Sequence, residues 1–172
     1  MDDVVILTGF MGTGKSATGR LLARELGWDF LDLDEEVERA AGKSVARVFA
    51  EEGEARFRER EAQALCRALT RTRLVIATGG GVLGREENRR SLAGRIVVNL
   101  DASAEECLRR VRRSPVERPL LSGPDPEAAA RRLWEERRPL YAAVPRRVDT
   151  TGKTPGEVAR EIRERFLGEG AA

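Results

Sequence analysis

Short apolar runs recur along the chain and are separated by longer segments of mixed polarity. Runs of about four to eight apolar, often β-branched residues bounded by turn residues are typical of strands buried on both faces of a parallel sheet. The pattern therefore predicts strands at residues 4–9 (VVILTG), 28–34 (WDFLDLD), 74–81 (LVIATGGG), 95–101 (RIVVNLD) and about 146–150 (RRVDT).

The segments between these runs carry apolar residues at three- and four-residue spacing, which is typical of amphipathic helices. Gly27 is expected to end the first helix, a break is expected near Gly42, and Gly53 separates the next two helices. Strands alternating with helices predict an α/β fold, a parallel sheet with helices on both faces. The predicted helices span residues 16–26, 35–52, 54–71, 85–93, 103–113, 127–138 and 155–167.

A proline-rich segment interrupts this alternation at residues 115–126, which hold four of the chain's seven prolines. Such a segment cannot form a regular helix or a central strand. Long irregular loops in compact domains are often lids over a binding site. Arg118, flanked by Pro115 and Pro119, could then close over a transferring phosphate and exclude water from it. A disordered insertion is the alternative.

The composition fits one compact domain spanning residues 1–172 and indicates its setting. Of the 172 residues 41% are hydrophobic, but no apolar run is long enough to cross a membrane. Two cysteines without a C-x-x-C pair, and no segment resembling a signal peptide, predict a reducing, cytoplasmic location. The 31 basic and 29 acidic residues are interspersed and 5% of residues are aromatic, which argues against nucleic-acid binding.

The chain contains no histidine. This excludes Ser-His-Asp hydrolysis, Cys-His catalysis and His-ligated zinc sites. A general base that works near neutral pH must then be a carboxylate or, less often, a lysine, tyrosine or cysteine. Carboxylates and hydroxyls favour Mg²⁺ as the metal, if one is bound.

One motif lies between the first strand and the first helix. Gly9, Gly14, Lys15 and Ser16 match the phosphate-binding pattern G-x-x-x-x-G-K-[ST]. The backbone N–H groups of such a loop cradle phosphate oxygens, helped by the positive end of the following helix. Lys15 would bridge the terminal phosphates and the Ser16 hydroxyl would ligate Mg²⁺, whereas the alternative is a tight structural turn. The candidate nucleotide-binding residues of the loop are Gly12, Thr13, Gly14, Lys15, Ser16 and Ala17.

Two acids, Asp32 and Asp34, end the second predicted strand. Side chains repeat every two residues along a strand, so both carboxylates are expected to point the same way. At the carboxyl edge of a parallel sheet, one could hold the water shell of a metal and the other could accept a hydrogen bond from a substrate hydroxyl. The alternative is that Asp34 caps the next helix or that the two acids lie on a solvated surface.

Three further features could bind a substrate. Arg58 and Glu61 are three residues apart on a predicted helix and form either a carboxylate clamp or a surface ion pair. The glycines of residues 79–81 either let backbone approach a ligand or make a tight turn. Arg137 and Arg138 precede Pro139, so either could bind substrate or stabilise the end of its helix.

These motifs, in this order and over nearly the whole chain, resemble the shikimate kinase family. The residues that carry the resemblance are GFMGTGKS, DLD, GEARFRERE, GGG, RPLL and RRPLY. It implies a three-layer P-loop fold of the nucleoside-monophosphate-kinase type, with a substrate-binding region at about residues 33–61 and a lid at about 112–126. The implied reaction is ATP- and Mg²⁺-dependent phosphorylation of the 3-hydroxyl of shikimate, which gives shikimate 3-phosphate and ADP in aromatic amino-acid biosynthesis.

The resemblance also implies a role for each matched residue. Asp34 would be the base or orienting acceptor for the 3-hydroxyl, and Lys15 and Arg118 would contact the phosphates. Ser16 would ligate Mg²⁺ directly and Asp32 through water. Arg58 and Arg137 would grip the carboxylate of shikimate, and the position relative to PLY favours Arg137 over Arg138. The implied acceptor-binding residues are Asp34, Phe49, Phe57, Arg58, Glu61, Gly79, Gly80, Gly81 and Arg137, and the implied adenine contacts are near Arg110 and Lys153.

Another small-molecule kinase and a nucleotide-dependent switch are the alternative functions. A different small-molecule kinase, such as a gluconate kinase, would not account for two carboxylate-gripping arginines combined with GGG. A nucleotide-dependent switch of the GTPase type would usually show an N-K-x-D guanine-reading motif, which the sequence lacks. The sequence is therefore expected to be that of a monomeric enzyme whose partners are ATP and shikimate.

Overall fold

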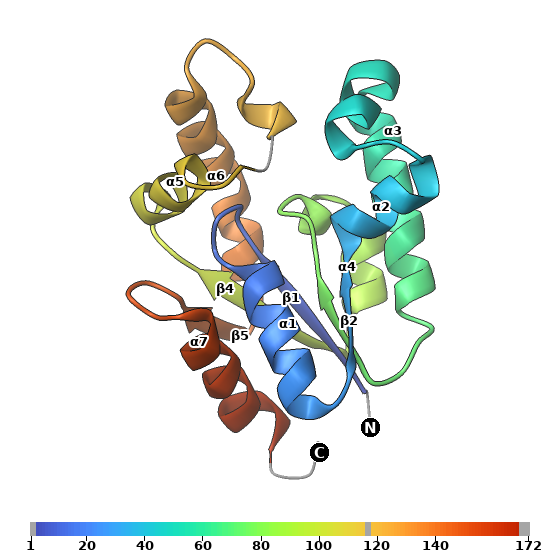
Figure 1. Cartoon of the computed structure of the whole chain (residues 1–172), viewed down its shortest axis with the longest axis vertical. Coiled ribbons are helices and arrows are strands. Elements are labelled where there is room, and N and C mark those ends of the chain that lie inside the picture. Colours follow the sequence, from blue (N-terminus) through green and yellow to red (C-terminus); the bar gives the residue numbers. More distant parts are fainter. Residues whose placement is uncertain (1–2, 116–117, 169–172) are drawn as a thin grey trace.

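The computed structural model describes residues 3–115 and 118–168, and the fold is a five-stranded sheet with helices on both faces (Figure 1). The strand order is β2-β3-β1-β4-β5, and every neighbouring pair is parallel. This confirms the predicted parallel α/β architecture. The strands are β1 (Val4–Gly9), β2 (Asp29–Asp32), β3 (Leu74–Ala77), β4 (Ile96–Asp101) and β5 (Arg146–Asp149).

Alternate side chains of the central strand enter two different cores. Val4 and Ile6 of β1 pack beneath α3, α4 and α6, while Val5 and Leu7 pack against α1 and α7. Three layers result. The helices are α1 (Lys15–Leu26), α2 (Leu33–Ala41), α3 (Val45–Ala68), α4 (Glu86–Leu92), α5 (Ala104–Arg112), α6 (Pro126–Ala142) and α7 (Pro155–Ile162), with 3₁₀ turns η1 (Val82–Gly84) and η2 (Pro119–Leu121) and a π-helical turn η3 (Arg163–Leu167).

The second strand is shorter than predicted, and this changes the setting of one acid. β2 ends at Asp32, whose side chain accepts a hydrogen bond from the Asp34 backbone N–H and caps α2. The expectation that both acids lie on one strand is therefore wrong, because Asp34 lies in the first turn of α2. The alternative prediction, that Asp34 caps the helix, is also wrong, because Asp32 is the capping residue.

The helix that precedes β5 is longer than predicted. α6 continues through Pro139 to Ala142, although the sequence predicted an end at residue 138. Its last turn is kept because the Pro139 carbonyl accepts a hydrogen bond from the Ala143 N–H, and because Leu140 and Tyr141 pack against the core. Arg137 and Tyr141 are therefore one helical turn apart on one continuous helix.

The glycines that were expected to interrupt the helices do so. Gly42 ends α2 in the left-handed conformation, and Gly53 adopts φ 83° and ψ 167° inside α3, where it kinks the helix. Residues 116–117 of the predicted lid lie outside the described residues, and Pro119–Leu121 form the short turn η2. Within the described part of the chain, no helix is long and apolar enough to span a membrane.

Candidate active site

The glycine-rich loop joins β1 to α1 at the carboxyl edge of the central strand, which is where open parallel sheets bind ligands. The Lys15 ammonium folds back over this loop and donates to the carbonyl oxygens of Gly9 at 2.9 Å and Phe10 at 2.8 Å. Burial, with the nearby positive charge of Arg118, lowers the pKa of Lys15 to about 8. Binding of an anion here would restore the preference for the charged form.

Ser16 and Asp32 place oxygen ligands side by side at the start of α1. The Ser16 hydroxyl donates to one oxygen of the Asp32 carboxylate, and the other oxygen of Asp32 accepts from the Asp34 N–H at 3.0 Å. A hydroxyl and a carboxylate beside a phosphate loop are the donor set that Mg²⁺ prefers. These two residues therefore fit the metal site that the sequence suggested.

The Oδ1 atom of Asp34 is buried, and among the described residues it has no hydrogen-bond partner. Burial raises the pKa of Asp34 to about 6, and the negative charges of Glu61 and Asp32 act in the same direction. Gly79 lies between the two carboxylates, since a Cβ atom there would be 2.3 Å from Glu61 Oε1 and 3.0 Å from Asp34 Oδ1. The pKa of Asp34 therefore lies closer to neutrality than that of an ordinary carboxyl group, and among the described residues one of its oxygens has no hydrogen-bond partner.

Arg58 is held by two carboxylates. Its Nη1 donates to Glu61 at 2.9 Å, while Nε and Nη2 donate to Glu54 at 3.3 and 3.2 Å. The side chain of Glu61 is 0% exposed and that of Arg58 is 15% exposed, so the surface ion-pair alternative is wrong. The guanidinium lies over Gly81, where a Cβ atom would be 2.6 Å from Cζ and both Nη atoms.

Two aromatic rings adjoin this clamp on α3. The rings of Phe49 and Phe57 are 4.7 Å apart, and Cζ of Arg58 lies 5.0 Å from the centre of the Phe57 ring. Both residues line the cleft described below. They present an apolar wall of the kind that packs against a ring-shaped ligand.

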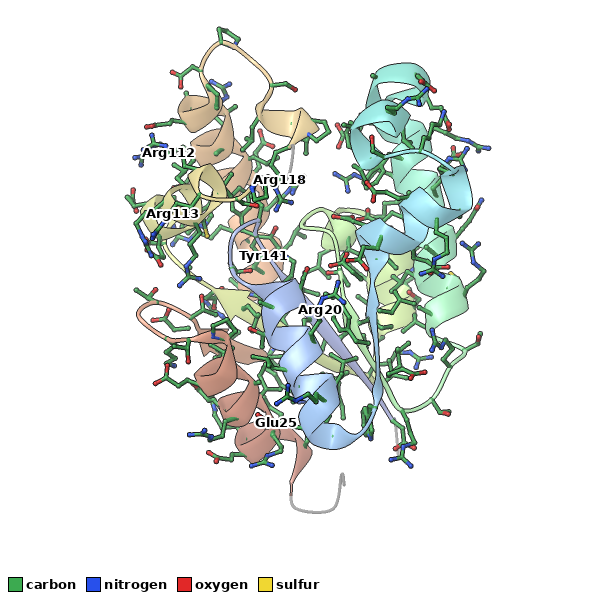
Figure 2. All side chains as sticks on the ribbon, viewed as in Figure 1. Arg20, Glu25, Arg112, Arg113, Arg118 and Tyr141 are labelled. Carbon is green, nitrogen blue, oxygen red and sulfur yellow. The ribbon has the colours of Figure 1, made fainter. Side chains whose placement is uncertain are left out.

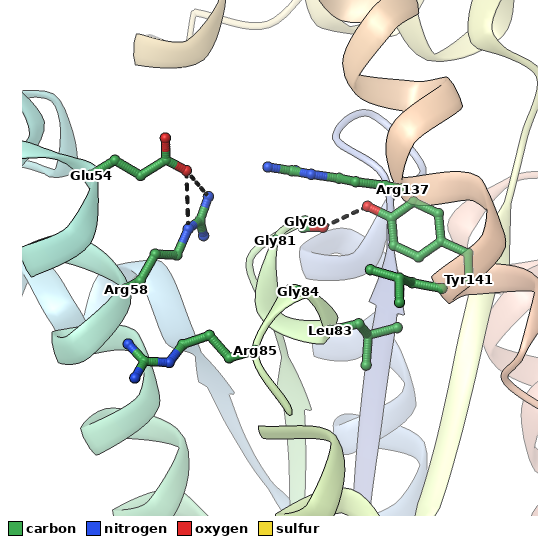
Figure 3. A pocket seen from close by; sticks show the side chains of 10 residues that line it. Glu54, Arg58, Gly80, Gly81, Leu83, Gly84, Arg85, Arg137 and Tyr141 are labelled. Atoms are coloured by element: carbon green, nitrogen blue, oxygen red, sulfur yellow. Dashed lines mark hydrogen bonds and ion pairs between the residues drawn. The ribbon is translucent and has the colours of Figure 1, made fainter. Parts of the chain in front are cut away.

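Arg137 approaches the glycine turn from α6 on the opposite side of the site (Figure 3). Its Nη1 is 3.2 Å from the position of a Cβ atom on Gly80. Arg138 points elsewhere, with its guanidinium 5.5 Å from the centre of the Trp134 ring. The structure therefore puts Arg137, and not Arg138, on the side of the predicted acceptor site.

One cleft of about 520 Å³ lies between helices α2 and α3 on one side and the turn η2 on the other. Figure 2 shows Arg118 projecting from the η2 side above the phosphate loop, and its buried Nε has no hydrogen-bond partner among the described residues. A neighbouring pocket of about 280 Å³ shares Arg58, Gly80, Gly81 and Arg137 (Figure 3). The predicted residues that line the main cleft are Ser16, Asp32, Asp34, Phe49, Phe57, Arg58, Glu61, Gly79, Gly80, Gly81, Arg118 and Arg137.

Comparison with known proteins identifies the family. A family model described as shikimate kinase matches residues 11–167. The chain belongs to the shikimate kinase family. A shikimate kinase of Symbiobacterium thermophilum is 46% identical over 169 residues, which cover 96% of this chain and 97% of that protein. The structure of shikimate kinase from Acinetobacter baumannii in complex with shikimate matches with a TM-score of 0.89 and 38% identity, over 94% of this chain and 91% of that one.

A gluconokinase from Sinorhizobium meliloti is also similar, with a TM-score of 0.53 over 93% of this chain and 89% of that one. Its identity is only 20%, so the likeness is one of fold alone. The gluconate alternative therefore gains no support beyond the shared P-loop architecture of shikimate kinases and related enzymes.

Two residues that the family resemblance suggested as nucleotide contacts have other partners in the structure. Lys153 pairs with Glu161 at 2.7 Å. Arg110 donates to the carbonyl oxygens of Gly12 at 3.3 Å and Thr150 at 2.8 Å. Arg110 thus links the phosphate loop to the loop after β5.

Sequence reasoning gave no role to two residues at the site. Glu54 holds Arg58, and Tyr141 donates a hydrogen bond to the Gly80 carbonyl. Both lie four residues from an arginine that was singled out, which is the spacing that brings side chains together on a helix. That spacing was the available signal, although the end predicted for α6 at residue 138 hid it in the case of Tyr141.

Proposed function

We propose that the protein phosphorylates the 3-hydroxyl of shikimate with ATP, giving shikimate 3-phosphate and ADP as a step of aromatic amino-acid biosynthesis. The observation that carries the proposal is the convergence of Asp34, Arg58 and Arg137 on one cleft beside the phosphate loop. These groups suit an acceptor that has both a hydroxyl and a carboxylate. Membership of the shikimate kinase family, and a relative solved with shikimate bound, support this acceptor.

In this proposal the acceptor is held by its two ends. Arg58 and Arg137 bind the carboxylate, because guanidinium groups make strong, directional hydrogen bonds to carboxylates. Glu61 keeps Arg58 in place. Phe49 and Phe57 pack against the ring, and the backbone of Gly79, Gly80 and Gly81 approaches it closely. Glycine is needed there because a Cβ atom on Gly79 or Gly81 would collide with a site residue.

Asp34 then works at the other end of the acceptor. Its unpartnered Oδ1 accepts the hydrogen bond of the 3-hydroxyl and takes its proton as the oxygen attacks the terminal phosphorus of ATP. A carboxyl whose pKa is about 6 is mostly deprotonated at neutral pH yet still binds a proton when the hydroxyl becomes acidic. In-line transfer needs this positioning and charge neutralisation more than covalent help.

The phosphates lie on the loop of Gly12, Thr13, Gly14 and Ala17. Lys15 exchanges its contacts with the carbonyl oxygens of Gly9 and Phe10 for the phosphates, and Arg118 covers them from the lid. Ser16 would hold Mg²⁺ directly and Asp32 through water, and the ion would neutralise charge on the phosphates. Arg110 and Lys153 would border the adenine. These roles follow from the family motif and from the contacts of each residue.

At the scale of the chain, the proposal treats residues 1–172 as one kinase domain. The substrate-binding region at about 33–61 and the lid at about 112–126 would close over the two substrates and exclude water. The protein would act as a monomer, on small molecules alone.

One assay tests the activity. The protein is incubated with Mg·ATP and with shikimate, gluconate, a nucleoside monophosphate or no acceptor, and ADP release is followed. We expect ADP release that depends on shikimate, with one shikimate 3-phosphate formed for each ADP. Release that is indifferent to shikimate, or faster with gluconate, would refute the proposal.

A further inference from the structure

Tyr141 touches the acceptor site without belonging to the chemistry described above. It lies on α6 one turn after Arg137, and its side chain is directed at the glycine turn (Figure 3). Tyr141 is buried, with 5% of its surface exposed. The phenol O–H donates to the Gly80 carbonyl oxygen at 2.5 Å. It is the only tyrosine of the chain.

This hydrogen bond constrains a group on the other side of the same peptide. A peptide unit is planar and trans, so the Gly80 carbonyl and the Gly81 N–H point in opposite directions. With the carbonyl directed at Tyr141, the Gly81 N–H is directed away from α6, toward the side where Arg58 lies (Figure 3). Within residues 3–115 and 118–168, this N–H has no hydrogen-bond acceptor.

A peptide between two glycines needs such a constraint. Glycine reaches positive and negative φ at similar cost, so the Gly80–Gly81 plane can rotate far more easily than one between other residues. A rotated plane would turn the carbonyl oxygen toward Arg58 and away from Tyr141. An acceptor carboxylate would then meet a carbonyl oxygen in place of an N–H donor, which is repulsive.

We propose that Tyr141 is a positioning residue that fixes the Gly80–Gly81 peptide, so that the Gly81 N–H is presented as a donor to the acceptor's carboxylate. The inference rests on the proposed function, since it takes shikimate as the acceptor. It also makes α6 the common support of two donors, because Arg137 lies on the same helix and over Gly80. The position of α6 then sets both groups together.

The phenol remains a donor under all ordinary conditions. Burial raises the pKa of Tyr141 to about 12, although the nearby positive charge of Arg137 acts in the opposite direction. The O–H therefore stays protonated throughout the pH range in which the enzyme can be assayed. A change of pH near neutrality cannot release the glycine turn through this residue.

Substitution Tyr141→Phe keeps the ring and removes only the donor. We expect the KM for shikimate to rise roughly 3- to 10-fold, the effect of losing one hydrogen bond, while the KM for ATP and kcat stay within about twofold. Glu136→Gln is the control, because Glu136 lies on the same helix with its side chain exposed to solvent. A shikimate KM equal to that of the unmodified enzyme, or equal rises in both KM values, would overturn the proposal.

A second measurement leaves the side chain in place and so does not depend on the folding of a variant. Because the chain has one tyrosine, 3-fluorotyrosine incorporation gives a single ¹⁹F signal from residue 141. We expect saturating shikimate to shift this signal and gluconate to leave it unchanged. A signal that shikimate does not move would overturn the inference.

The two proposals fail in different ways. If the unmodified enzyme releases no ADP with shikimate, the proposed function is wrong and the positioning role falls with it. If shikimate is phosphorylated but Tyr141→Phe kinetics match those of the unmodified enzyme, the positioning role alone is wrong.

Discussion

Asp34 and Lys15 carry opposite charges, yet burial moves the pKa of each toward neutrality. The physical cause is the same, since a desolvated group favours its neutral form. For the Asp34 carboxyl group this places the loss of its proton closer to neutral pH. For the Lys15 ammonium it also places the loss of the proton closer to neutral pH. A phosphate bound beside Lys15 would favour the charged form again.

The pH dependence of the reaction should show both groups. We expect kcat/KM for Mg·ATP to rise with pH as Asp34 loses its proton near 6, and to fall as Lys15 loses its proton near 8. Initial rates between pH 5 and 10 test this. With ATP saturating, the alkaline limb of kcat should move to higher pH, because bound phosphate favours charged Lys15. A flat profile across this range would contradict both assignments.

Asp34→Asn should abolish transfer and leave ATP binding largely intact. The variant should also be more stable than the unmodified protein. In the unmodified protein the folded state holds the Asp34 proton more tightly than the unfolded chain does, so the free energy of unfolding falls as pH rises from 3.8 to about 6. Removing the charge should therefore raise the free energy of unfolding at pH 7.5 by up to roughly 3 kcal/mol, and by little near pH 4. Calorimetry without Mg²⁺ or nucleotide measures this. Lost ATP binding would instead indicate a structural or metal role.

Arg58→Ala should raise the KM for shikimate roughly 10- to 100-fold, with a much smaller effect on ATP, because a charge-assisted hydrogen bond to the acceptor is lost. It should also destabilise the fold by roughly 1–3 kcal/mol, since buried Glu61 loses its partner. Arg56→Ala is the control: Arg56 lies on the same helix, and its side chain is 52% exposed. Equal losses for both substrates would argue against the clamp.

Among the elements, the β3–η1 turn shows why three consecutive glycines are used. Each glycine faces a different group: Gly79 the carboxylates of Glu61 and Asp34, Gly80 the guanidinium of Arg137, and Gly81 that of Arg58. A Cβ atom on Gly79 or Gly81 would collide with Glu61 or Arg58, and one on Gly80 would crowd Arg137 at 3.2 Å. The turn therefore forms the surface against which α3 and α6 place their charged side chains.

Helix α3 shows a second requirement for glycine. Gly53 has φ 83° and ψ 167°, which is accessible almost only to glycine, and open space surrounds it. An ion pair crosses the kink, since Glu52, which also pairs with Lys43, contacts Arg60 beyond Gly53. The kink sets the angle between the segments that carry Phe49 and Phe57.

Gly53→Ala should therefore destabilise the protein by roughly 1–3 kcal/mol through backbone strain, and should raise the KM for shikimate because Phe49 is displaced. Gly156→Ala is the matched control, since that glycine lies in α7 with open space and no positive φ. Alanine there should be neutral or stabilise the fold by up to about 1 kcal/mol. Urea unfolding compares the two. Equal stability of both variants would show that the kink is not strained.

For the whole molecule, the sheet order places the phosphate loop at its centre. β1 lies between β3 and β4, so the connections after its neighbours supply the glycine turn on one side and α5 and α6 on the other (Figure 1). The acceptor and phosphate groups thus meet at one edge although they come from distant parts of the chain. Binding at this edge should be visible in the stability of the entire fold.

In a melting experiment, removal of the metal should weaken the stabilisation by nucleotide but not the stabilisation by shikimate. An ATP analogue with Mg²⁺, at about 100 times its Kd, should add about 2.7 kcal/mol of stability and raise Tm by roughly 5–10 °C. With EDTA the nucleotide effect should shrink, because Ser16 and Asp32 no longer act through the ion. The rise given by shikimate alone should be unaffected. An unchanged nucleotide effect in EDTA would remove the metal from the proposal.

Local patterns in the sequence determined much of this protein. The apolar runs predicted all five strands, and Gly42 and Gly53 marked breaks, because backbone conformation depends mainly on neighbouring residues. The phosphate loop and the order of the motifs indicated the family, because each motif is a short run of residues that can be read directly from the sequence. Boundaries failed where a side chain decided them, as at Asp32, which caps α2, and at Pro139, which α6 accommodates.

Only the tertiary structure decided the environment of each functional group. It buried the Arg58–Glu61 pair and separated Arg137 from Arg138. It left an oxygen of Asp34 without a hydrogen-bond partner among residues 3–115 and 118–168. It also joined Tyr141 to Gly80, which lies 61 residues earlier in the chain. Burial, pKa and hydrogen-bond partners depend on elements that are distant in sequence, and no local pattern contains that information.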